Sequence, residues 1–396
     1  MNSKLEERLL SLVSLWRGGG RARPLSPAEL GRAGDALLSL QRGLTGERRL
    51  AGAGYMEEPE LLGAYLLYYW PVSYMQVSLA ASRLACAADR PLRILDLGSG
   101  PGPASAALLD AFAPRQVELT LADGSERALG LARSILEGGA VRPLSLETRA
   151  LDLEQRADSD LPAGPFDLVV ASHLLNELWR GSPDRLARRQ GLLEAAASRL
   201  EEGGSLLLLE PALLETSREL LALRDRLAAR GFRILSPCLR GGACPALAAG
   251  ASHSCHAEVP WEPPEPVASL ARAAGLDRES VKMSFLVVSP AFRGAEGGPG
   301  AASAAAMGLL RARVVSEPML NKAGRIRFLL CNEEGRFALS AKKDDAAARA
   351  QGFFSLRRYD LIEASGLALR GEAAGAPAAY GFGPATSLRV VERLGD

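Results

Sequence analysis

The chain has 396 residues, more than one ordinary hydrophobic core accommodates, so we expect two or three domains. Hydrophobic residues make up 47% and charged residues 23%, a composition typical of a globular protein and not of a disordered one, and no apolar run reaches the roughly 20 residues needed to cross a bilayer. The net charge of +1 creates no field that would require nucleic acid as a partner, so any RNA-binding prediction must rest on local patches.

The first 90 residues carry a helical pattern. Leucines recur at helical spacing in three stretches, which glycine and proline residues separate: 5–16, 36–43 and 60–88. We therefore predict an N-terminal helical region, 1–90, that caps the next domain. Residues 1–23 end in several arginines, as a transit peptide can, but Glu6 and Glu7 argue against one because such peptides are poor in acidic residues. We expect a cytoplasmic protein.

Short apolar runs alternate with amphipathic helices from Pro91 onward. Seven strands are predicted, over 93–98, 117–122, 145–151, 166–172, 205–210, 232–236 and 284–289. Helices are predicted between most of them, over 103–112, 125–137, 184–201 and 213–230. Because helices separate successive strands, we expect a parallel sheet with helices on both faces: an α/β, seven-stranded, doubly wound Rossmann-like domain over 91–291.

The remaining segments differ in composition. A cysteine- and proline-rich insertion, 237–282, separates the last two predicted strands in place of a plain helix. Residues 292–306 are rich in glycine and alanine with little to bury, which predicts a linker. After the linker, 307–396 shows the short strands and turns of a small β-rich domain.

A glycine-rich loop follows the first predicted strand and precedes a helix. It consists of Gly98-Ser99-Gly100-Pro101-Gly102, in which glycine permits a positive φ and lets a ligand approach the backbone. Asp123 follows the next predicted strand, where a carboxylate can accept hydrogen bonds from both hydroxyls of a ribose. The pattern predicts a site for a nucleoside cofactor.

The spacing of this loop discriminates between two such cofactors. A dinucleotide site has G-x-G-x-x-G and a helix start that can hold a pyrophosphate, whereas this loop has G-x-G-x-G with a proline inside the turn. It resembles motif I of class I methyltransferases, which bind S-adenosylmethionine. The resemblance implies that Asp96 lies near the methionine end of the cofactor, Asp123 at the ribose, and Asp152 with Leu153 near the adenine. A glycine turn in another doubly wound fold is the alternative.

Three of the five cysteines cluster after the sixth predicted strand: Cys238, Cys244 and Cys255. Thiolates gathered in one loop of an intracellular protein are more often metal ligands than packing residues. Cys331 completes a four-thiolate set if the C-terminal domain folds back over this loop. Four thiolates suit zinc or a [4Fe-4S] cluster, and Cys244-Pro245 resembles the Cys-Pro step of iron–sulfur proteins. The alternatives are His253 or His256 with three thiolates around zinc, and unliganded thiols.

Several segments, taken in order, resemble a family of methyltransferase-like proteins associated with the small ribosomal subunit, the Rsm-type ribosome assembly factors. The matching segments fall within about 64–360 and include YLLYYWPVSY, LDLGSGPG, ASHLLNEL, SFLVV and FLLCNEEG. The resemblance implies S-adenosylmethionine binding and association with the rRNA of the small ribosomal subunit. It also implies a [4Fe-4S] cluster on Cys238, Cys244, Cys255 and Cys331. Segment 254–257 departs from the family, which has aromatic residues around this Cys-His pair.

Candidate catalytic residues follow the fourth and fifth predicted strands: His173, Asn176, Glu177 and Glu210. Methyl transfer is an in-line displacement that needs a positioned nucleophile and often a base, but polar residues at element ends also serve as helix caps. The assignment stays open between an rRNA methyltransferase, a non-catalytic assembly factor with structural cofactor and metal sites, and a small-molecule methyltransferase with a zinc loop.

Basic residues concentrate in the C-terminal region, where acidic neighbours partly dilute them. Positive side chains on a small β domain suit phosphate contacts. With rRNA as the implied partner, the candidates are Arg311, Arg313, Arg325, Arg327, Arg357 and Arg358. We expect no membrane contact and a monomer.

Overall fold

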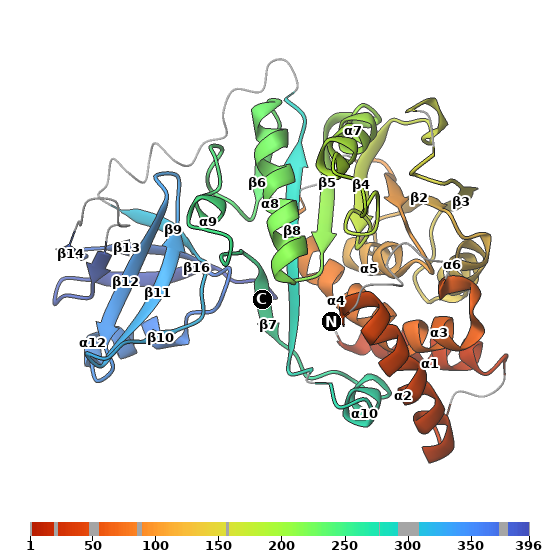
Figure 1. Ribbon diagram of the computed structural model, residues 1–396, viewed down its shortest axis with the longest axis horizontal. Helices are drawn as coiled ribbons and strands as arrows, with labels where there is room; N and C mark the ends of the chain where they lie inside the picture. Colours follow the sequence, from red (N-terminus) through yellow and green to blue (C-terminus); the bar gives the residue numbers. More distant parts are fainter. Residues whose placement is uncertain are drawn as a thin grey trace. The chain divides into compact units, whose positions relative to one another are not determined.

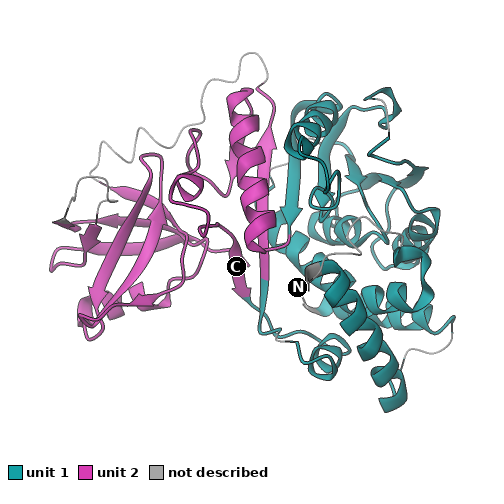
Figure 2. Ribbon diagram, in the orientation of Figure 1, with its two compact units in different colours: residues 1–210, 260–281 teal, residues 211–259, 282–396 magenta. Residues whose placement is uncertain are grey.

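The structure is a computed structural model (Figure 1) that describes residues 2–19, 23–46, 55–84, 89–155, 158–276, 278–291, 309–371 and 379–395. The chain forms two compact units (Figure 2): unit 1 comprises Met1–Glu210 with Pro260–Val281, and unit 2 comprises Pro211–Val259 with Lys282–Asp396. The predicted linker, 292–306, lies outside the described residues. No helix within the described ranges is both long and apolar enough to span a membrane.

Unit 1 is built on parallel strands in the order β3-β2-β1-β4-β5. Their bounds are Leu92–Leu97 for β1, Val117–Asp123 for β2, Ser145–Ala150 for β3, Phe166–Ser172 for β4 and Leu200–Glu210 for β5. Four of the six residues of the central strand β1 are apolar, and all but Arg93 are buried, because helices cover both faces of such a sheet. The edge strand β3 has no fully buried residue, and its sequence is correspondingly polar.

Helices connect these strands, as predicted: α5 (Pro103–Phe112), α6 (Glu126–Gly138) and α7 (Arg185–Ala197). The side chain of Ser125 caps α6 by accepting a hydrogen bond from the backbone N–H of Ala128 (3.2 Å). All seven predicted strands are present in the chain, although β5 begins at Leu200 and not at residue 205. The predicted α/β fold of the Rossmann-like methyltransferase type is confirmed.

The N-terminal region is helical, as predicted. Its elements are α1 (Asn2–Trp16), α2 (Pro27–Gln41), the π-helical turn η1 (Arg42–Gly46), the 3-10 turn η2 (Tyr55–Glu57), α3 (Pro59–Ala64), the π-helical turn η3 (Tyr65–Tyr69) and α4 (Trp70–Ala81). On α1, Arg8 forms a buried ion pair with Asp110 of α5 (2.6 Å). The hydroxyl of Tyr74 donates to the same carboxylate (2.7 Å). Because a buried carboxylate needs such partners, these contacts fix α1 and α4 to α5.

The insertion predicted over 237–282 folds into short elements. In unit 2, α8 (Leu214–Ala229) precedes β6 (Arg233–Ser236), which runs antiparallel to β8 (Ser280–Ser289). Between β6 and β8 lie α9 (Pro245–Ala248), β7 (Ala257–Pro260) and α10 (Val267–Ala273), and β7 pairs with β8. Helix α10 belongs to unit 1, where it packs against α2. The three clustered cysteines therefore lie in the connections around α9.

The predicted C-terminal β-rich domain is a second sheet, with the strand order β14-β15-β12-β11-β9-β13-β16 and β10 paired to β11. The strands are β9 (Leu310–Val314), β10 (Met319–Leu320), β11 (Arg325–Cys331), β12 (Arg336–Lys342), β13 (Leu361–Ser365), β14 (Ala368–Gly371), β15 (Ala379–Gly381) and β16 (Ser387–Glu392). A helix, α12 (Ala346–Ala350), and a 3-10 turn, η5 (Phe353–Ser355), join β12 to β13.

This second sheet closes into a barrel. Strands β13 and β14 follow each other with only Gly366 and Leu367 between them, yet β14 is the first strand of this order and β13 is the last but one. Gly366 is required at the bend, because its φ is +63° and an added Cβ would lie 2.2 Å from the carbonyl oxygen of Ala385. With β12 antiparallel to β11 and parallel to β15, the connectivity is that of an OB-fold barrel.

Candidate functional site

The glycine loop of unit 1 has a backbone that requires its glycines. Gly98, Gly100 and Gly102 have φ values of +64°, +51° and +74°, a region that L side chains rarely adopt. A Cβ added at Gly98 would lie 2.5 Å from the side chain of Leu174. The loop therefore presents its backbone without side chains between the end of β1 and the start of α5.

Asp96, the last acidic residue before this loop, is fully buried. Its Oδ2 accepts a hydrogen bond from the Ser105 hydroxyl (2.7 Å), whereas Oδ1 has no partner among the described residues. Burial, opposed by the bond from Ser105, raises the pKa of Asp96 to about 7. An unused buried acceptor beside a glycine loop suits a ligand that carries hydrogen-bond donors.

Asp123, the last residue of β2, contacts the same loop. Its carboxylate accepts hydrogen bonds from the backbone N–H of Gly100 (2.8 Å) and of Ser125 (2.9 Å). Burial raises the pKa of Asp123, and these two bonds lower it in part. Each oxygen keeps a second lone pair with which it can accept a hydrogen bond from a ribose hydroxyl.

The residues predicted from the sequence to bind adenine lie next to Asp123. Strands β2 and β3 pair in register up to Asp123 and Ala150, and the backbone N–H of Leu151 donates to the carbonyl oxygen of Asp123 (2.9 Å). In the turn that follows, Asp152 is exposed and accepts from the N–H of Glu154 (2.9 Å), whereas Leu153 is buried. The sheet register thus brings the predicted ribose and adenine residues to one edge.

The sequence analysis did not predict the residues that pack over the glycine loop, which we call its cover. A Cβ at Gly100 would lie 3.7 Å from the side-chain methyl of Met56, in η2. The next residue, Glu57, accepts a hydrogen bond from the Ser125 hydroxyl (2.6 Å), and the indole N–H of Trp70 donates to the carbonyl oxygen of Pro101 (3.0 Å). No sequence motif marks these contacts, since they join residues that are far apart along the chain.

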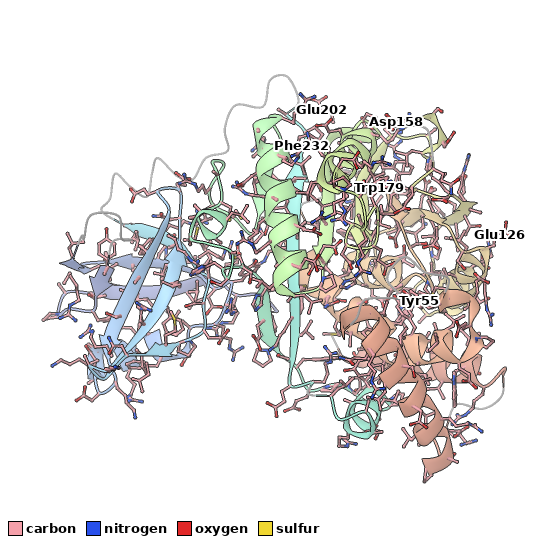
Figure 3. All side chains as sticks on the ribbon, in the orientation of Figure 1. Tyr55, Glu126, Asp158, Trp179, Glu202 and Phe232 are labelled. Carbon is pink, nitrogen blue, oxygen red and sulfur yellow. The ribbon has the colours of Figure 1, made fainter. Side chains whose placement is uncertain are left out.

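Two tyrosines belong to the same cover: Tyr55, which is buried and labelled in Figure 3, and half-buried Tyr65, with ring centroids 6.2 Å apart. Burial raises the pKa of both phenols, and the nearby carboxylate of Glu177 adds to the effect. The candidate catalytic residue Glu177 therefore lies close to this tyrosine pair.

The other candidate catalytic residues hold the segment after β4. His173 has a φ of +57° and its Nε2 lies 2.7 Å from the side-chain oxygen of Gln76. Burial lowers the pKa of His173 to about 4, which keeps the imidazole neutral. The Asn176 side chain donates to the carbonyl oxygen of His173 (3.0 Å), and Glu210 accepts from the N–H of Leu175 (2.9 Å). These contacts stabilise the turn; catalytic roles for the four residues stay a prediction.

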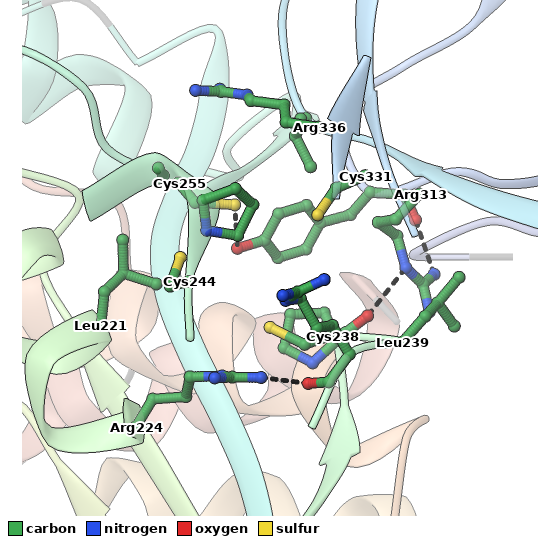
Figure 4. A pocket seen from close by; sticks show the side chains of 15 residues that line it. Leu221, Arg224, Cys238, Leu239, Cys244, Cys255, Arg313, Cys331 and Arg336 are labelled. Atoms are coloured by element: carbon green, nitrogen blue, oxygen red, sulfur yellow. Dashed lines mark hydrogen bonds between the residues drawn. The ribbon is translucent and has the colours of Figure 1, made fainter. Parts of the chain in front are cut away.

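The four cysteines of the predicted metal set line one cavity of about 40 Å³ within unit 2 (Figure 4). Cys238 follows β6, Cys244 begins α9, Cys255 precedes β7 and Cys331 ends β11. Sequence reasoning anticipated that these four residues would meet. Cys86, the fifth cysteine, lies outside the described residues.

Cys244 is buried, the other three cysteines are half-buried, and the thiols are close enough to affect one another. Burial, followed by the charge of the Cys255 thiolate, raises the pKa of Cys238 to about 12, and the same two causes raise that of Cys331 to about 12. Among the described residues, no group of three or more His, Cys, Asp and Glu side chains has the geometry of a bound metal. The cavity lining does not include His253 or His256.

Arginines and a tyrosine complete the cavity wall. The hydroxyl of Tyr359 lies 3.5 Å from the sulfur of Cys255. Burial alone would lower the pKa of Arg224, but the charges of Cys238, Asp225 and Cys244 outweigh burial and raise it. Arg240 donates to the carbonyl oxygen of Glu333, which links the cysteine loop to the barrel. The wall is therefore cationic on several sides of the sulfurs.

The predicted RNA-binding arginines are not equivalent. Arg313 requires a correction: it is buried, and it donates to the carbonyl oxygens of Pro237 (3.0 Å) and Tyr359 (2.9 Å), so it serves the interior of unit 2 and not its surface. Arg358 is largely covered and pairs with Glu317 (2.7 Å). Arg311, Arg327 and Arg357 are exposed, and Arg325 is half-buried on β11.

Comparison with protein families gives a match over residues 60–350 to the family described as mitochondrial small ribosomal subunit Rsm22. No curated protein sequence matches the chain.

Solved structures similar to this chain include three methyltransferases. The ribosomal protein L11 methylase of Lactobacillus delbrueckii subsp. bulgaricus is 15% identical over 55% of this chain and 79% of its own, with a TM-score of 0.33. The magnesium protoporphyrin IX methyltransferase of Synechocystis with bound SAM is 13% identical over 65% and 98%, with a TM-score of 0.35. The precorrin-6y C5,15-methyltransferase of Geobacter metallireducens is 16% identical over 55% and 87%, with a TM-score of 0.33.

Proposed function

The chain belongs to the mitochondrial small ribosomal subunit Rsm22 family, and from this premise we propose that it binds S-adenosylmethionine and acts on or binds the rRNA of the small ribosomal subunit during assembly or translation. The observation that supports cofactor binding most directly is the unpartnered Oδ1 of Asp96 beside three glycines with positive φ. The ammonium group of a methionine moiety would provide the hydrogen-bond donor that this buried oxygen lacks. Asp123 would hold the ribose, and Asp152 with Leu153 the adenine.

Calorimetric titration of the full chain with S-adenosylmethionine tests this proposal. We expect saturable binding that Asp96→Asn and Asp123→Asn each weaken about tenfold or more, because each change removes a charged acceptor. Glu118→Gln, a charge-neutralising change on the same strand as Asp123 but away from its carboxyl end, serves as the control. Absence of binding to the wild type would overturn the cofactor proposal.

The four-thiol cavity is proposed to hold a [4Fe-4S] cluster on Cys238, Cys244, Cys255 and Cys331, with zinc as the alternative. The donor set fits, because four thiols line one small cavity whose wall carries arginines that offset the charge of thiolates. When bound, such a group would join the loop around α9 to the last residue of β11 and supply a one-electron redox centre.

Anaerobic purification followed by iron, sulfide and zinc analysis and a visible spectrum tests the metal proposal. Iron and sulfide with a broad absorbance are expected in the wild type and should be lost in Cys331→Ser. Cys86→Ser, at the fifth cysteine, is the control and should keep them. Zinc alone would establish the alternative, and absence of any metal would reject both.

The OB-fold barrel is the proposed contact for rRNA. OB-folds bind oligonucleotides on the face of their second and third strands, which are β11 and β12 here. On these strands, Arg325 pairs in register with Lys342, and exposed Arg327 pairs with Ser340. This basic row, together with exposed Arg311 and Arg357, suits the phosphate backbone of RNA.

A non-catalytic role in ribosome assembly is the second candidate, and one observation favours it over methyl transfer. Three of the four candidate catalytic side chains hold the turn after β4: His173 with Gln76, Asn176 with the carbonyl oxygen of His173, and Glu210, through Oε1, with the backbone N–H of Leu175. Transfer of label from S-adenosylmethionine to small-subunit precursors separates the two, because only an enzyme incorporates label. Labelling of a small molecule alone would favour the third possibility, a small-molecule methyltransferase with a zinc loop.

A further inference from the structure

Arg224 of α8 is a buried cation whose hydrogen bonds to the cysteine loop go beyond what the metal proposal above uses. Its side chain is 1% exposed, yet it lines the cavity of the four thiols (Figure 4). The guanidinium donates to the carbonyl oxygens of Arg240 and Gly242, both of which lie in the loop between Cys238 and Cys244. It also donates to the carboxylate of its neighbour Asp225 (2.7 Å).

Asp225 holds the end of the same loop. Both oxygens of its carboxylate accept from the backbone N–H of Cys244, each at 3.0 Å. The two neighbours on α8 therefore bind the loop at three alternate positions, 240, 242 and 244. Helix α8 can position these contacts because it is itself held in place by the buried side chains of Leu220, Leu223 and Leu227.

One donor of Arg224 is left over. Its Nε is buried and has no hydrogen-bond partner among the described residues. A buried N–H without an acceptor is uncommon in folded proteins and suits a bound group that supplies one. The cavity that Arg224 lines contains the sulfurs of Cys238 and Cys244, and a group bound there would present sulfur atoms as acceptors.

We propose that Arg224 and Asp225 are positioning residues for the four-cysteine site: together they hold the Cys238–Cys244 loop in its ligand-bearing conformation before metal arrives, and Arg224 provides the positive charge beside the bound group. The proposal rests on the proposed metal site. Arginine suits both parts of the role, because its planar fork reaches two carbonyl oxygens at once while its charge stays fixed. Four thiolates around zinc or a [4Fe-4S] core leave net negative charge, which a buried cation offsets.

Hydrogen exchange of the metal-free full chain tests the positioning part, whichever metal the site prefers. Arg224→Gln and Asp225→Asn should each increase exchange in peptides that cover 238–247 by about tenfold, because each removes loop hydrogen bonds. Arg189→Gln is the matched control: Arg189 is also 1% exposed and also binds a backbone carbonyl, that of Leu178, but it lies in unit 1. Unchanged exchange in both α8 variants would overturn the proposal.

The metal-bound protein tests whether Arg224 provides positive charge beside the bound group. After reconstitution with iron and sulfide, the reduction potential should be more negative in Arg224→Gln than in the wild type, whereas Arg224→Lys, which keeps the charge but not the fork, should stay near the wild type. If the wild type binds only zinc, competition with a chelator replaces the potential, and Arg224→Gln should bind Zn²⁺ about tenfold more weakly than Arg224→Lys. If the metal-loaded Arg224→Gln protein matches the wild type in these measurements, the charge part of the proposal is overturned. Arg224 would then act only by holding the loop through hydrogen bonds. A wild type without metal rejects the metal site, while the exchange experiment still decides the positioning of the loop.

Discussion

The Tyr359 hydroxyl lies 3.5 Å from the sulfur of Cys255, and the backbone of Tyr359 has a φ of +69°. Such a φ is uncommon for a bulky residue and persists only where the surroundings hold it. Here Arg313 donates to the carbonyl oxygen of Tyr359 (2.9 Å), and the ring of Phe285 meets the tyrosine ring edge-on. The barrel therefore delivers a phenol and a fourth thiol, Cys331, to the same cavity.

Replacement of Tyr359 by phenylalanine should keep the ring packing and remove the hydroxyl. We expect metal-free Tyr359→Phe to lose about 1 kcal/mol of unfolding free energy, the usual worth of one buried hydrogen bond. In iron-loaded protein the potential should become more negative, because hydrogen bonds to sulfur stabilise the reduced state. Denaturant unfolding and redox titration measure the two effects. Tyr380→Phe, in the same barrel, is the control; a Tyr359→Phe protein equal to it in both would contradict the role of the hydroxyl.

Replacement of Gly98 by alanine should damage the cofactor loop. The added methyl would meet Leu174 at 2.5 Å on a backbone with a φ of +64°, so we expect a loss of roughly 1–3 kcal/mol in stability and about tenfold or more in affinity for S-adenosylmethionine. Gly130→Ala is the matched control, since Gly130 lies within α6 with no atom within 4 Å of the added methyl. Thermal unfolding and calorimetry give both quantities. Equal affinity in the two variants would argue against cofactor binding at this loop.

The sequence was informative wherever a contact depends on local pattern. Strand β1 and the loop after it are recognisable because a buried parallel strand is continuously apolar and a tight turn at positive φ needs glycine. The meeting of Cys331 with Cys255 was anticipated from residue chemistry, since thiolates in such numbers share a site. In the structure, the four cysteines predicted as metal ligands line one cavity.

Contacts that depend on tertiary packing were not visible in the sequence. Arg224 sits within an amphipathic helix, where an arginine normally indicates a solvated face, and only the fold buries it to 1% exposure. Met56 covers Gly100 from a segment with no motif. Arg313 was predicted to lie on the surface because β9 is short. Its alternation of apolar and polar residues is too brief to show which side chains point into the barrel.

Charge reversal on the barrel should weaken RNA binding. Arg325→Glu with Arg327→Glu is expected to lower the affinity of the full chain for a single-stranded RNA about tenfold or more and to reduce the slope of log affinity against log salt by about one or two, since each phosphate contact contributes nearly one unit of slope. Fluorescence anisotropy at several salt concentrations measures both. Arg32→Glu with Arg142→Glu, two exposed arginines of unit 1, carries the same change in net charge. If both double variants lose affinity equally, net charge and not the barrel face is responsible.

Glu210 should make stability depend on pH in a defined direction. Burial raises the pKa of Glu210 to about 8, with hydrogen bonds from Asn176 and the charge of Arg189 opposing the rise. The folded state thus binds a proton that the unfolded state, with a pKa near 4.5, has already lost. The contribution of Glu210 to the free energy of unfolding is therefore largest below about pH 4.5, and it declines as the pH rises toward 8.

Glu210→Gln removes this titration while keeping the size of the side chain. The wild type should lose on the order of a few kcal/mol of unfolding free energy between pH 5 and pH 8 that the variant does not lose, because each unit of pKa shift corresponds to about 1.4 kcal/mol. Urea unfolding at pH 5, 6, 7 and 8 measures the difference, and Glu202→Gln, at an exposed position of β5, is the control. A variant with the same pH profile as the wild type would mean that Glu210 is ionised in the folded protein, held so by Arg189 and the backbone N–H groups of the turn.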